Sequence, residues 1–257
     1  MLGLGLPPSN KIGCSSIMSL NEIKALTFDT GGTILDWHTG FRTALAELGA
    51  KHGVDKDWAA LANELRRRSL KKMINLGEKS QPSYNMDDSH RLSLDEILTE
   101  NELDATTTEE RQDIWWKRVH SLRCWPDFPT ALPQLSKKYI CASFTLLSVR
   151  IIVDTARANG LKWDSILSCE IFGKYKVLPE AYTTTAKLLN LEPRECLMVA
   201  CHNFDLDAAK NVGFKTAFVK RPDEWGLEGP PDPNPKPHHD IVVDNFPELV
   251  STLGISF

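Results

Sequence analysis

Short apolar runs and helical repeats alternate along the second half of the chain. The runs are typical of buried strands, whereas the helical segments repeat their apolar positions every three or four residues. Strands that alternate with helices predict an α/β fold with a parallel, doubly wound, Rossmann-like sheet. The predicted strands are residues 24–30, 137–144, 164–170, 195–201, 215–221 and 241–244, and the predicted helices are 148–160, 179–191, 206–213 and 248–254.

A long helical stretch interrupts this alternation directly after the first strand. Residues 37–123 show only helical spacing of their apolar positions. We therefore expect an α/β core domain, 21–36 and 125–257, with a helical cap domain, 37–124, inserted into it.

The first predicted strand ends on a charged residue. Residues 25–37 read ALTFDTGGTILDW, so an apolar run reaches Asp29 and then breaks on two glycines. An ionised side chain at the end of a buried strand is costly unless the protein uses it. Ser143, Lys176 and the segment 201–205 are expected at the ends of other strands. Because ligands of open parallel sheets bind at the carboxyl ends of the strands, the sequence predicts one crevice where these groups meet.

Four motifs follow one another in the predicted core. They are FDTGGT at 28–33, ASFT at 142–145, GKYKVLPEAY at 173–182 and VACHNFDLDAAKNVGF at 199–214. In this order and spacing they resemble the haloacid dehalogenase superfamily, and within it the metal-free (S)-2-haloacid dehalogenases. The resemblance implies an α/β core with an inserted helical cap and a hydrolase activity.

The resemblance also assigns catalytic groups. It implies that Asp29 is the nucleophile, whose carboxylate attacks the substrate and forms a covalent ester. Lys176 would pair with Asp29 and keep that carboxylate ionised. Asp205 would orient Lys176 and help activate the water that hydrolyses the ester; it also suits a helix N-cap, which is compatible with that role.

Two positions argue against phosphoryl transfer. Phosphatases of the superfamily carry a general acid two residues after the nucleophile, to protonate a leaving alkoxide, and this chain has Gly31 there. They also carry a magnesium-binding aspartate where this chain has Cys201, and a thiol is a poor ligand for a hard cation. A halide leaves without a proton, so the resemblance implies carbon–halogen cleavage with no metal and no organic cofactor.

Four small residues match positions that hold the nucleophile and the substrate carboxylate. They are Thr30, Gly31 with its backbone, Thr33 and Ser143. Each hydroxyl taken alone would also fit a turn.

Two further candidates lie on predicted helices. Tyr182 matches an active-site tyrosine of the family, although a tyrosine on a helix is also common as packing. Arg66 lies in the insert where the family carries a halide-binding arginine, and an always-charged guanidinium suits that role. In the run ELRRRSLKKM, Arg67 or Arg68 could equally face inward.

Two residues depart from the family, because Phe144 and His202 stand where asparagine is usual. Phe144 removes an amide donor from the expected halide site. His202 could position water, act as a base near neutral pH or fill space.

The composition narrows the classes of function. The 257 residues are 42% apolar and 25% charged with a net charge of −4, as in an ordinary globular protein. No polybasic run suggests nucleic acid, and no apolar run is long enough to span a membrane. The six cysteines include no CxxC pair, so we expect no disulfide framework and a reducing, cytoplasmic location.

Two segments lack any periodicity. Residues 1–20 are rich in Gly, Pro and Ser, lack the features of a signal peptide and are expected to form a flexible N-terminal extension. Residues 224–240 read as a proline-rich loop.

We therefore expect a hydrolase that acts on a small anionic 2-haloacid and releases halide and a 2-hydroxy acid. The resemblance allows a homodimer, and the halogen and chain length stay open. Two other functions also stay open: a magnesium-dependent, phosphatase-like hydrolase, and a binding protein that has lost catalysis. Halide release with and without a chelator separates the three.

Overall fold

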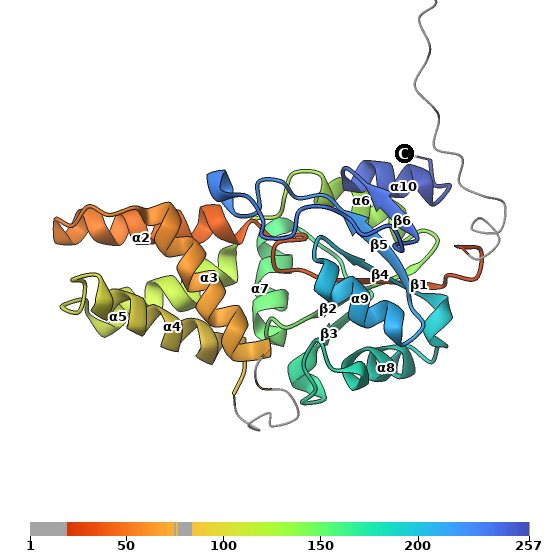
Figure 1. Ribbon diagram of the computed structural model, residues 1–257, viewed down its shortest axis with the longest axis horizontal. Coiled ribbons are helices and arrows are strands. Elements are labelled where there is room, and N and C mark those ends of the chain that lie inside the picture. The colour runs from red at the N-terminus through yellow and green to blue at the C-terminus, as the bar shows by residue number, and fades with distance from the viewer. Residues whose placement is uncertain (1–19, 75, 77–83, 257) are drawn as a thin grey trace, which may run out of the picture.

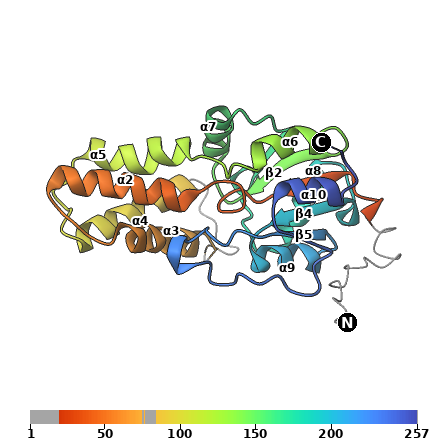
Figure 2. The same ribbon diagram turned by 90° about the horizontal axis from the view of Figure 1, so that it is seen from above.

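The computed structural model describes residues 20–74, 76 and 84–256. The expected extension, 1–20, lies outside the described residues except for Leu20. The chain forms two lobes, one of helices and one built around a sheet, which lie side by side in both ribbon views (Figures 1 and 2).

Six parallel strands form the sheet, which confirms the predicted fold class. Their order, β3-β2-β1-β4-β5-β6, reverses direction at β1, which pairs with both β2 and β4. Such a reversal opens a crevice at the carboxyl end of the central strand. The strands are β1 (Ala25–Phe28), β2 (Ile140–Thr145), β3 (Ser165–Ser168), β4 (Cys196–Ala200), β5 (Lys215–Val219) and β6 (Ile241–Val243).

Helices cover both faces of this sheet (Figure 1). α6 and α10 pack together on one face, where Phe28 of β1 contacts Phe128 and Phe246 at ring-centroid distances of 5.6 and 6.2 Å. α8 and α9 pack together on the other face, and α7 lies beside β3. The helices are α6 (Phe128–Leu135), α7 (Val149–Asn159), α8 (Pro179–Leu188), α9 (Asn203–Asn211) and α10 (Phe246–Thr252), with short turns η3 (Cys169–Ile171), η4 (Pro193–Glu195) and η5 (Gly226–Glu228).

Two of these helices show how the sequence sets their ends. α7 begins after Ser148, whose side chain accepts a hydrogen bond from the Ile151 amide, and ends at Gly160 in the left-handed conformation. α9 begins three residues earlier than predicted, at Asn203, so that Asp205 lies inside its first turn rather than before it.

The other lobe contains the helices of the insert. The helices are α2 (Trp37–His52), α3 (Trp58–Ile74), α4 (Met86–Glu100) and α5 (Thr108–Gln112), followed by the π-helical η1 (Asp113–Arg118) and the 3-10 turn η2 (Val119–Ser121). The last part of the insert therefore changes its helical winding twice, from α to π and then to 3-10.

The chain leaves the sheet lobe and returns to it at neighbouring points. The Asp36 amide donates to the Arg123 carbonyl at 2.9 Å, and the Trp125 amide donates to the Ile34 carbonyl at 2.8 Å. The two connections between the lobes therefore run side by side. In the part of the chain that the structure covers, no helix combines the length and apolar character needed to cross a bilayer.

Candidate active site

Asp29 directly follows β1, at the point where the strand order reverses. Its carboxylate is buried and accepts hydrogen bonds on both oxygens. Lys176 Nζ lies 3.1 Å from Oδ1, while Thr33 Oγ1 and His202 Nδ1 lie 2.8 and 3.2 Å from Oδ2. Burial opposes ionisation, but the Lys176 ammonium and the contact with His202 hold the pKa of Asp29 well below its usual value. The carboxylate is therefore an anion in this structure.

Lys176 connects Asp29 to a second buried carboxylate. Its ammonium donates to Asp205 Oδ2 at 2.6 Å, and Tyr182 Oη donates to the other oxygen of Asp205 at 2.6 Å. Burial alone would lower the pKa of Lys176, but Asp205 and Asp29 raise it above the usual value. Burial also raises the pKa of Tyr182, so this phenol keeps its proton. Lys176 comes from the loop before α8, Tyr182 from α8 and Asp205 from α9.

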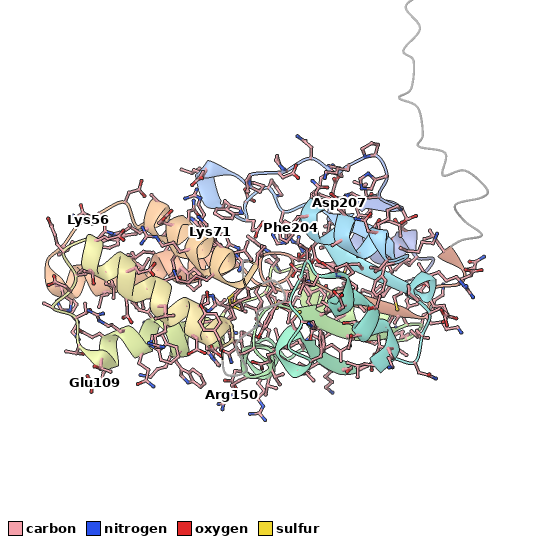
Figure 3. All side chains as sticks on the ribbon, turned by 60° about the horizontal axis from the view of Figure 1, so that its bottom comes forward. Lys56, Lys71, Glu109, Arg150, Phe204 and Asp207 are labelled. Atoms are coloured by element: carbon pink, nitrogen blue, oxygen red, sulfur yellow. The ribbon has the colours of Figure 1, made fainter. Side chains whose placement is uncertain are left out.

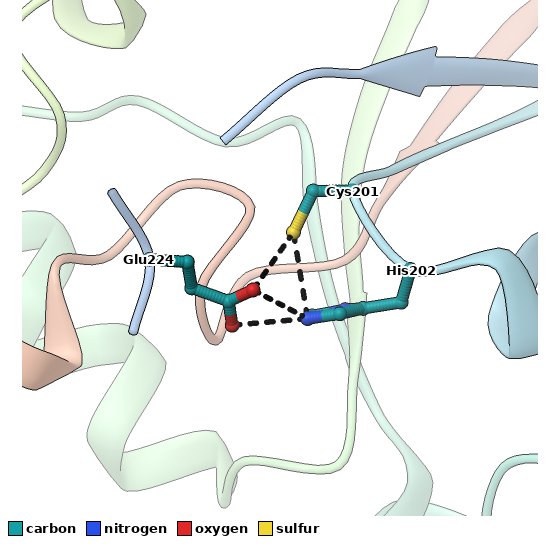
Figure 4. A group of neighbouring side chains, drawn as sticks. All are labelled: Cys201, His202 and Glu224. Atoms are coloured by element: carbon teal, nitrogen blue, oxygen red, sulfur yellow. Dashed lines mark hydrogen bonds and ion pairs between the residues drawn. The ribbon is translucent and has the colours of Figure 1, made fainter. Parts of the chain in front are cut away.

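His202, which contacts Asp29, also contacts a third buried carboxylate, that of Glu224; Figure 4 shows the second of these contacts. His202 Nε2 lies 3.0 Å from Glu224 Oε1, and Trp37 Nε1 donates to the same oxygen at 2.9 Å. The Cys201 thiol lies 3.4 Å from His202 Nε2 and 3.6 Å from Glu224 Oε2. Burial would lower the pKa of His202, but the carboxylates of Glu224 and Asp29 raise it well above its usual value, so the ring is an imidazolium.

Sequence reasoning missed Glu224, which lies at the start of the segment read as a proline-rich loop. The side chain is only 1% exposed and rests against Gly32. Gly32 has a positive φ of 98°, and a Cβ there would lie 1.9 Å from Glu224 Oε1. The second glycine after the nucleophile was the available signal, because it indicates that another group approaches the loop closely.

Arg66 is the arginine of the run that reaches this site. Its Nη2 donates to the Gly31 carbonyl at 2.9 Å, its guanidinium lies 5.4 Å from the Trp37 ring centre, and its Nε is buried without a partner among the described residues. Arg67 instead pairs with Glu228, and Arg68 pairs with Glu64 and Glu100. The sequence left open which of the three arginines faces the site, and the structure shows that it is Arg66.

The two lobes enclose a small cavity beside Asp29. The centre of a water molecule can occupy about 10 Å³ of this cavity. The cavity therefore has room for about one water molecule. Phe204 lies where the lobes meet (Figure 3) and stacks on the His202 ring. The lining residues are Asp29, Gly31, Arg66, Leu70, Met86, Thr145, Leu146, Leu147, Lys176, His202, Phe204 and Asp205.

Comparison with known proteins identifies the family. The family model for haloacid dehalogenase-like hydrolases matches residues 23–213, about three quarters of the chain. The chain belongs to this family. The prediction of a hydrolase of the haloacid dehalogenase type is confirmed.

Several relatives of this hydrolase are 2-haloacid dehalogenases. (S)-2-Haloacid dehalogenase 4A of Burkholderia cepacia is 27% identical over 208 residues, which cover 79% of this chain and 85% of that protein. The (S)-2-haloacid dehalogenase of Xanthobacter autotrophicus is 34% identical over 99 residues, only 38% of this chain and 39% of that enzyme. The defluorinating L-2-haloacid dehalogenase Rha0230 has a similar structure, with a TM-score of 0.84 and 33% identity over 90% of this chain and 95% of that chain. The L-2-haloacid dehalogenase PA0810 matches with a TM-score of 0.83 and 31% identity over 90% and 99% of the two chains.

In this haloacid dehalogenase-like hydrolase, β2 ends at Thr145, two residues beyond Ser143, the residue expected at the strand end. Ser143 is not at the strand end: it pairs with Phe28 inside the sheet, and its hydroxyl is buried without a partner among the described residues. The apolar run continues, and Thr145 ends the strand. Thr145 Oγ1 lies 2.7 Å from Thr30 Oγ1 and accepts a hydrogen bond from the Leu147 amide at 3.1 Å.

Phe144 does not line the cavity beside Asp29. Its ring packs 4.7 Å from Lys176 Nζ and 5.1 Å from the Tyr182 ring, behind the cavity rather than in it. Leu146 lines the cavity instead. The prediction that Ser143 and Phe144 contact the substrate is therefore wrong in register, because β2 runs on through Thr145.

The residues around Asp29 do not suit the magnesium ion that related phosphatases use. Both oxygens of Asp29 accept hydrogen bonds from protein groups, and Arg66 engages the Gly31 carbonyl. Burial raises the pKa of the Cys201 thiol, which keeps it protonated where those phosphatases place a carboxylate. A hard cation would face two positive side chains, Lys176 and Arg66, and too few oxygen ligands.

Proposed function

We propose that this hydrolase cleaves the carbon–halogen bond of a small 2-haloalkanoate through an ester on Asp29. The observation that carries the proposal is the buried Asp29 carboxylate, held ionised by Lys176 and His202 at the wall of a cavity that Arg66 also lines. The likeness to L-2-haloacid dehalogenases such as Rha0230 supports the choice of substrate.

The first step is a displacement at carbon. An Asp29 oxygen attacks C2, the new C–O bond inverts that centre, and the halide departs with the electron pair of the C–X bond. The halide needs no proton, which fits Gly31 where a phosphatase has its acid. The buried Nε of Arg66 has no partner among the described residues, so it supplies an unused donor for an anion.

The second step hydrolyses the ester. Alkylation removes the negative charge of Asp29, which lies 3.2 Å from His202 Nδ1. Losing that charge lowers the pKa of His202, so the ring releases a proton and its Nδ1 becomes a base. Water adds to the Asp29 carboxyl carbon and gives one proton to His202, which passes it to the departing oxygen of the 2-hydroxy acid. The acid proton left on Asp29 then moves to His202, which restores the carboxylate and the imidazolium; the proton that the ring released first leaves with the halide as H⁺. Glu224 holds the ring from the other side throughout.

The helical lobe, 37–124, acts as a cap in this proposal. The cavity has room for about one water molecule, so a haloacid reaches Asp29 only when the lobes separate. Closure then removes water during displacement and brings Arg66 of α3 against the Gly31 carbonyl.

The test is halide release from a panel of 2-haloacids with and without a chelator, followed by rapid quench and mass spectrometry of the protein. We expect release that survives chelation, an adduct on Asp29, and no release by the Asp29→Asn variant. Loss of activity with chelator, with phosphate-ester hydrolysis restored by magnesium, would instead establish a phosphatase. Absence of turnover for every haloacid in the panel would leave a binding protein and refute the proposal.

A further inference from the structure

A second cluster of ligating side chains lies on the outside of the sheet lobe. Asp207 of α9 and the adjacent histidines His238 and His239, from the loop before β6, each place one oxygen or nitrogen atom within 4.8 Å of the others. Figure 3 shows Asp207 at the surface of α9, beside this loop. None of the three lines the cavity at Asp29, so the proposed function does not account for them.

His239 is arranged as a neutral ligand with a free lone pair. It is 8% exposed, and its Nε2 lies 2.8 Å from Asn203 Oδ1. The Asn203 amide is fixed, because its Nδ2 donates to the Asn234 carbonyl at 2.8 Å and its Oδ1 accepts from the Lys236 amide. Nε2 of His239 must therefore carry the proton. Its Nδ1 is then an acceptor that is buried without a partner among the described residues.

This pattern matches what holds histidine ligands in metalloproteins. A metal-binding imidazole commonly donates its second N–H to an oxygen, which fixes the tautomer and the ring orientation.

The other two groups supply an anion and an accessible imidazole. His238 Nε2 lies 2.7 Å from Asp207 Oδ1, and its side chain is 46% exposed. Lys236 pairs with the second oxygen of Asp207, and its side chain is 43% exposed, so it can swing away. One carboxylate and two imidazoles form a ligand set typical of zinc and its neighbours in the first transition row.

We propose that Asp207, His238 and His239 bind a divalent transition metal such as Zn²⁺, with the exposed side of the ion open to water. The metal displaces the Lys236 ammonium and the proton between His238 and Asp207. It joins the proline-rich loop to α9, the helix whose first turn also carries Asp205.

A second group of side chains also places its ligand atoms within 4.8 Å of one another. This group is Cys201, His202 and Glu224. Those atoms already contact each other and belong to the active site (Figure 4). The experiment must therefore separate the two locations, and their chemistry does so because only the second contains a thiol.

The test uses the full chain stripped of metal and titrated with Zn²⁺ by calorimetry. We expect one ion per chain, at least tenfold weaker binding by His238→Ala and by Asp207→Asn, and unchanged binding by His52→Ala, a matched histidine in the helical lobe. Asn203→Ala should weaken binding about tenfold or more by releasing the His239 ring. Lys236→Met should bind more tightly, because it removes a competing cation.

Cobalt(II) gives an independent readout on the unmodified protein. We expect a visible spectrum without the intense thiolate-to-cobalt absorption, and halide release unchanged in His238→Ala. Zinc binding that persists in His238→Ala and Asp207→Asn, or a thiolate absorption that disappears in Cys201→Ser, would place the ion at the other cluster and overturn the proposal. An absence of stoichiometric binding would overturn it as well.

Discussion

Two chains of hydrogen bonds reach Asp29 from opposite sides, and they differ in how they are built. We call Lys176, Asp205 and Tyr182 the lysine arm, and His202, Glu224 and Trp37 the histidine arm. Each ends in a buried carboxylate that a neutral donor, Tyr182 or Trp37, holds in place. In both arms a cation lies between that carboxylate and Asp29.

The cations of the two arms differ in how readily they release a proton. The lysine ammonium keeps its charge when Asp29 is alkylated, because the Asp205 carboxylate still lies 2.6 Å away. The imidazolium is the one of the two that can give up a proton near neutral pH once it loses an anionic neighbour. We therefore assign fixed charge stabilisation to the lysine arm and proton transfer to the histidine arm, and the following variants break or sharpen that division.

The largest effect is expected from Lys176→Met. The variant leaves Asp29 and Asp205 buried without their shared cation, so one of them takes up a proton and the nucleophile is lost. We expect halide release to fall by about 10³-fold or more, and stability to fall by about 3–5 kcal/mol at neutral pH. Lys174→Met, two residues away in the same loop, is the matched control. Activity within a few-fold of the parent would contradict the role of the lysine arm.

A smaller, step-specific effect is expected from Glu224→Gln. The lysine arm is intact in this variant, so ester formation continues, whereas the ring of His202 loses its anionic partner. Hydrolysis of the ester should slow by about 10²-fold, so the Asp29 adduct accumulates in quenched samples. The pKa of His202 falls when Glu224 is neutral, so the pH profile of ester hydrolysis should move to lower pH.

Glu228→Gln provides the control for Glu224→Gln. Glu228 comes from the same loop but pairs with Arg67 and Asn63 outside the cavity. An unchanged pH profile in Glu224→Gln, or equal loss of ester formation and hydrolysis, would show that the histidine arm does not transfer the proton.

Sequence reasoning located the lysine arm more completely than the histidine arm. Asp29, Lys176, Tyr182 and Asp205 fall in spaced motifs, and the fold brings them into contact. Glu224 lies in a segment without periodicity, so no pattern indicates that its carboxylate is buried. Its position depends on how the loop after β5 folds back over Gly32, which is a property of the assembled protein.

The error at the second motif has a different cause. Hydrophobic pattern predicts that 137–144 contains a strand but leaves its ends uncertain by a few residues. Only the last side chains of a strand face the crevice, and alternate side chains lie on the same face of the sheet. Placing the strand end two residues too early therefore assigns Ser143 to the position that Thr145 occupies.

Tyr182→Phe tests how far the lysine arm tolerates loss of its outermost member. The variant removes one hydrogen bond to Asp205 but leaves the contact between Lys176 and Asp205. A hydrogen bond to a charged group contributes about 1.5–3 kcal/mol, so we expect roughly tenfold lower activity in steady-state halide release. Tyr175→Phe, whose hydroxyl donates to the Tyr84 carbonyl, should leave activity unchanged. A loss as large as that of Lys176→Met would mean that Tyr182 itself contacts the reacting atoms.

The smallest effects should distinguish the two hydroxyls of β2. Ser143→Ala removes a buried hydroxyl that has no partner among the described residues, so stability should change by less than about 0.5 kcal/mol or rise slightly. Thr145→Val removes the contacts to Thr30 and to the Leu147 amide at the wall of the cavity. The free energy of unfolding of that variant should be about 1 kcal/mol lower, and its kcat/KM should be several-fold lower. Thermal unfolding and halide release measure both, and the reverse ranking of the two variants would restore Ser143 as the group at the strand end.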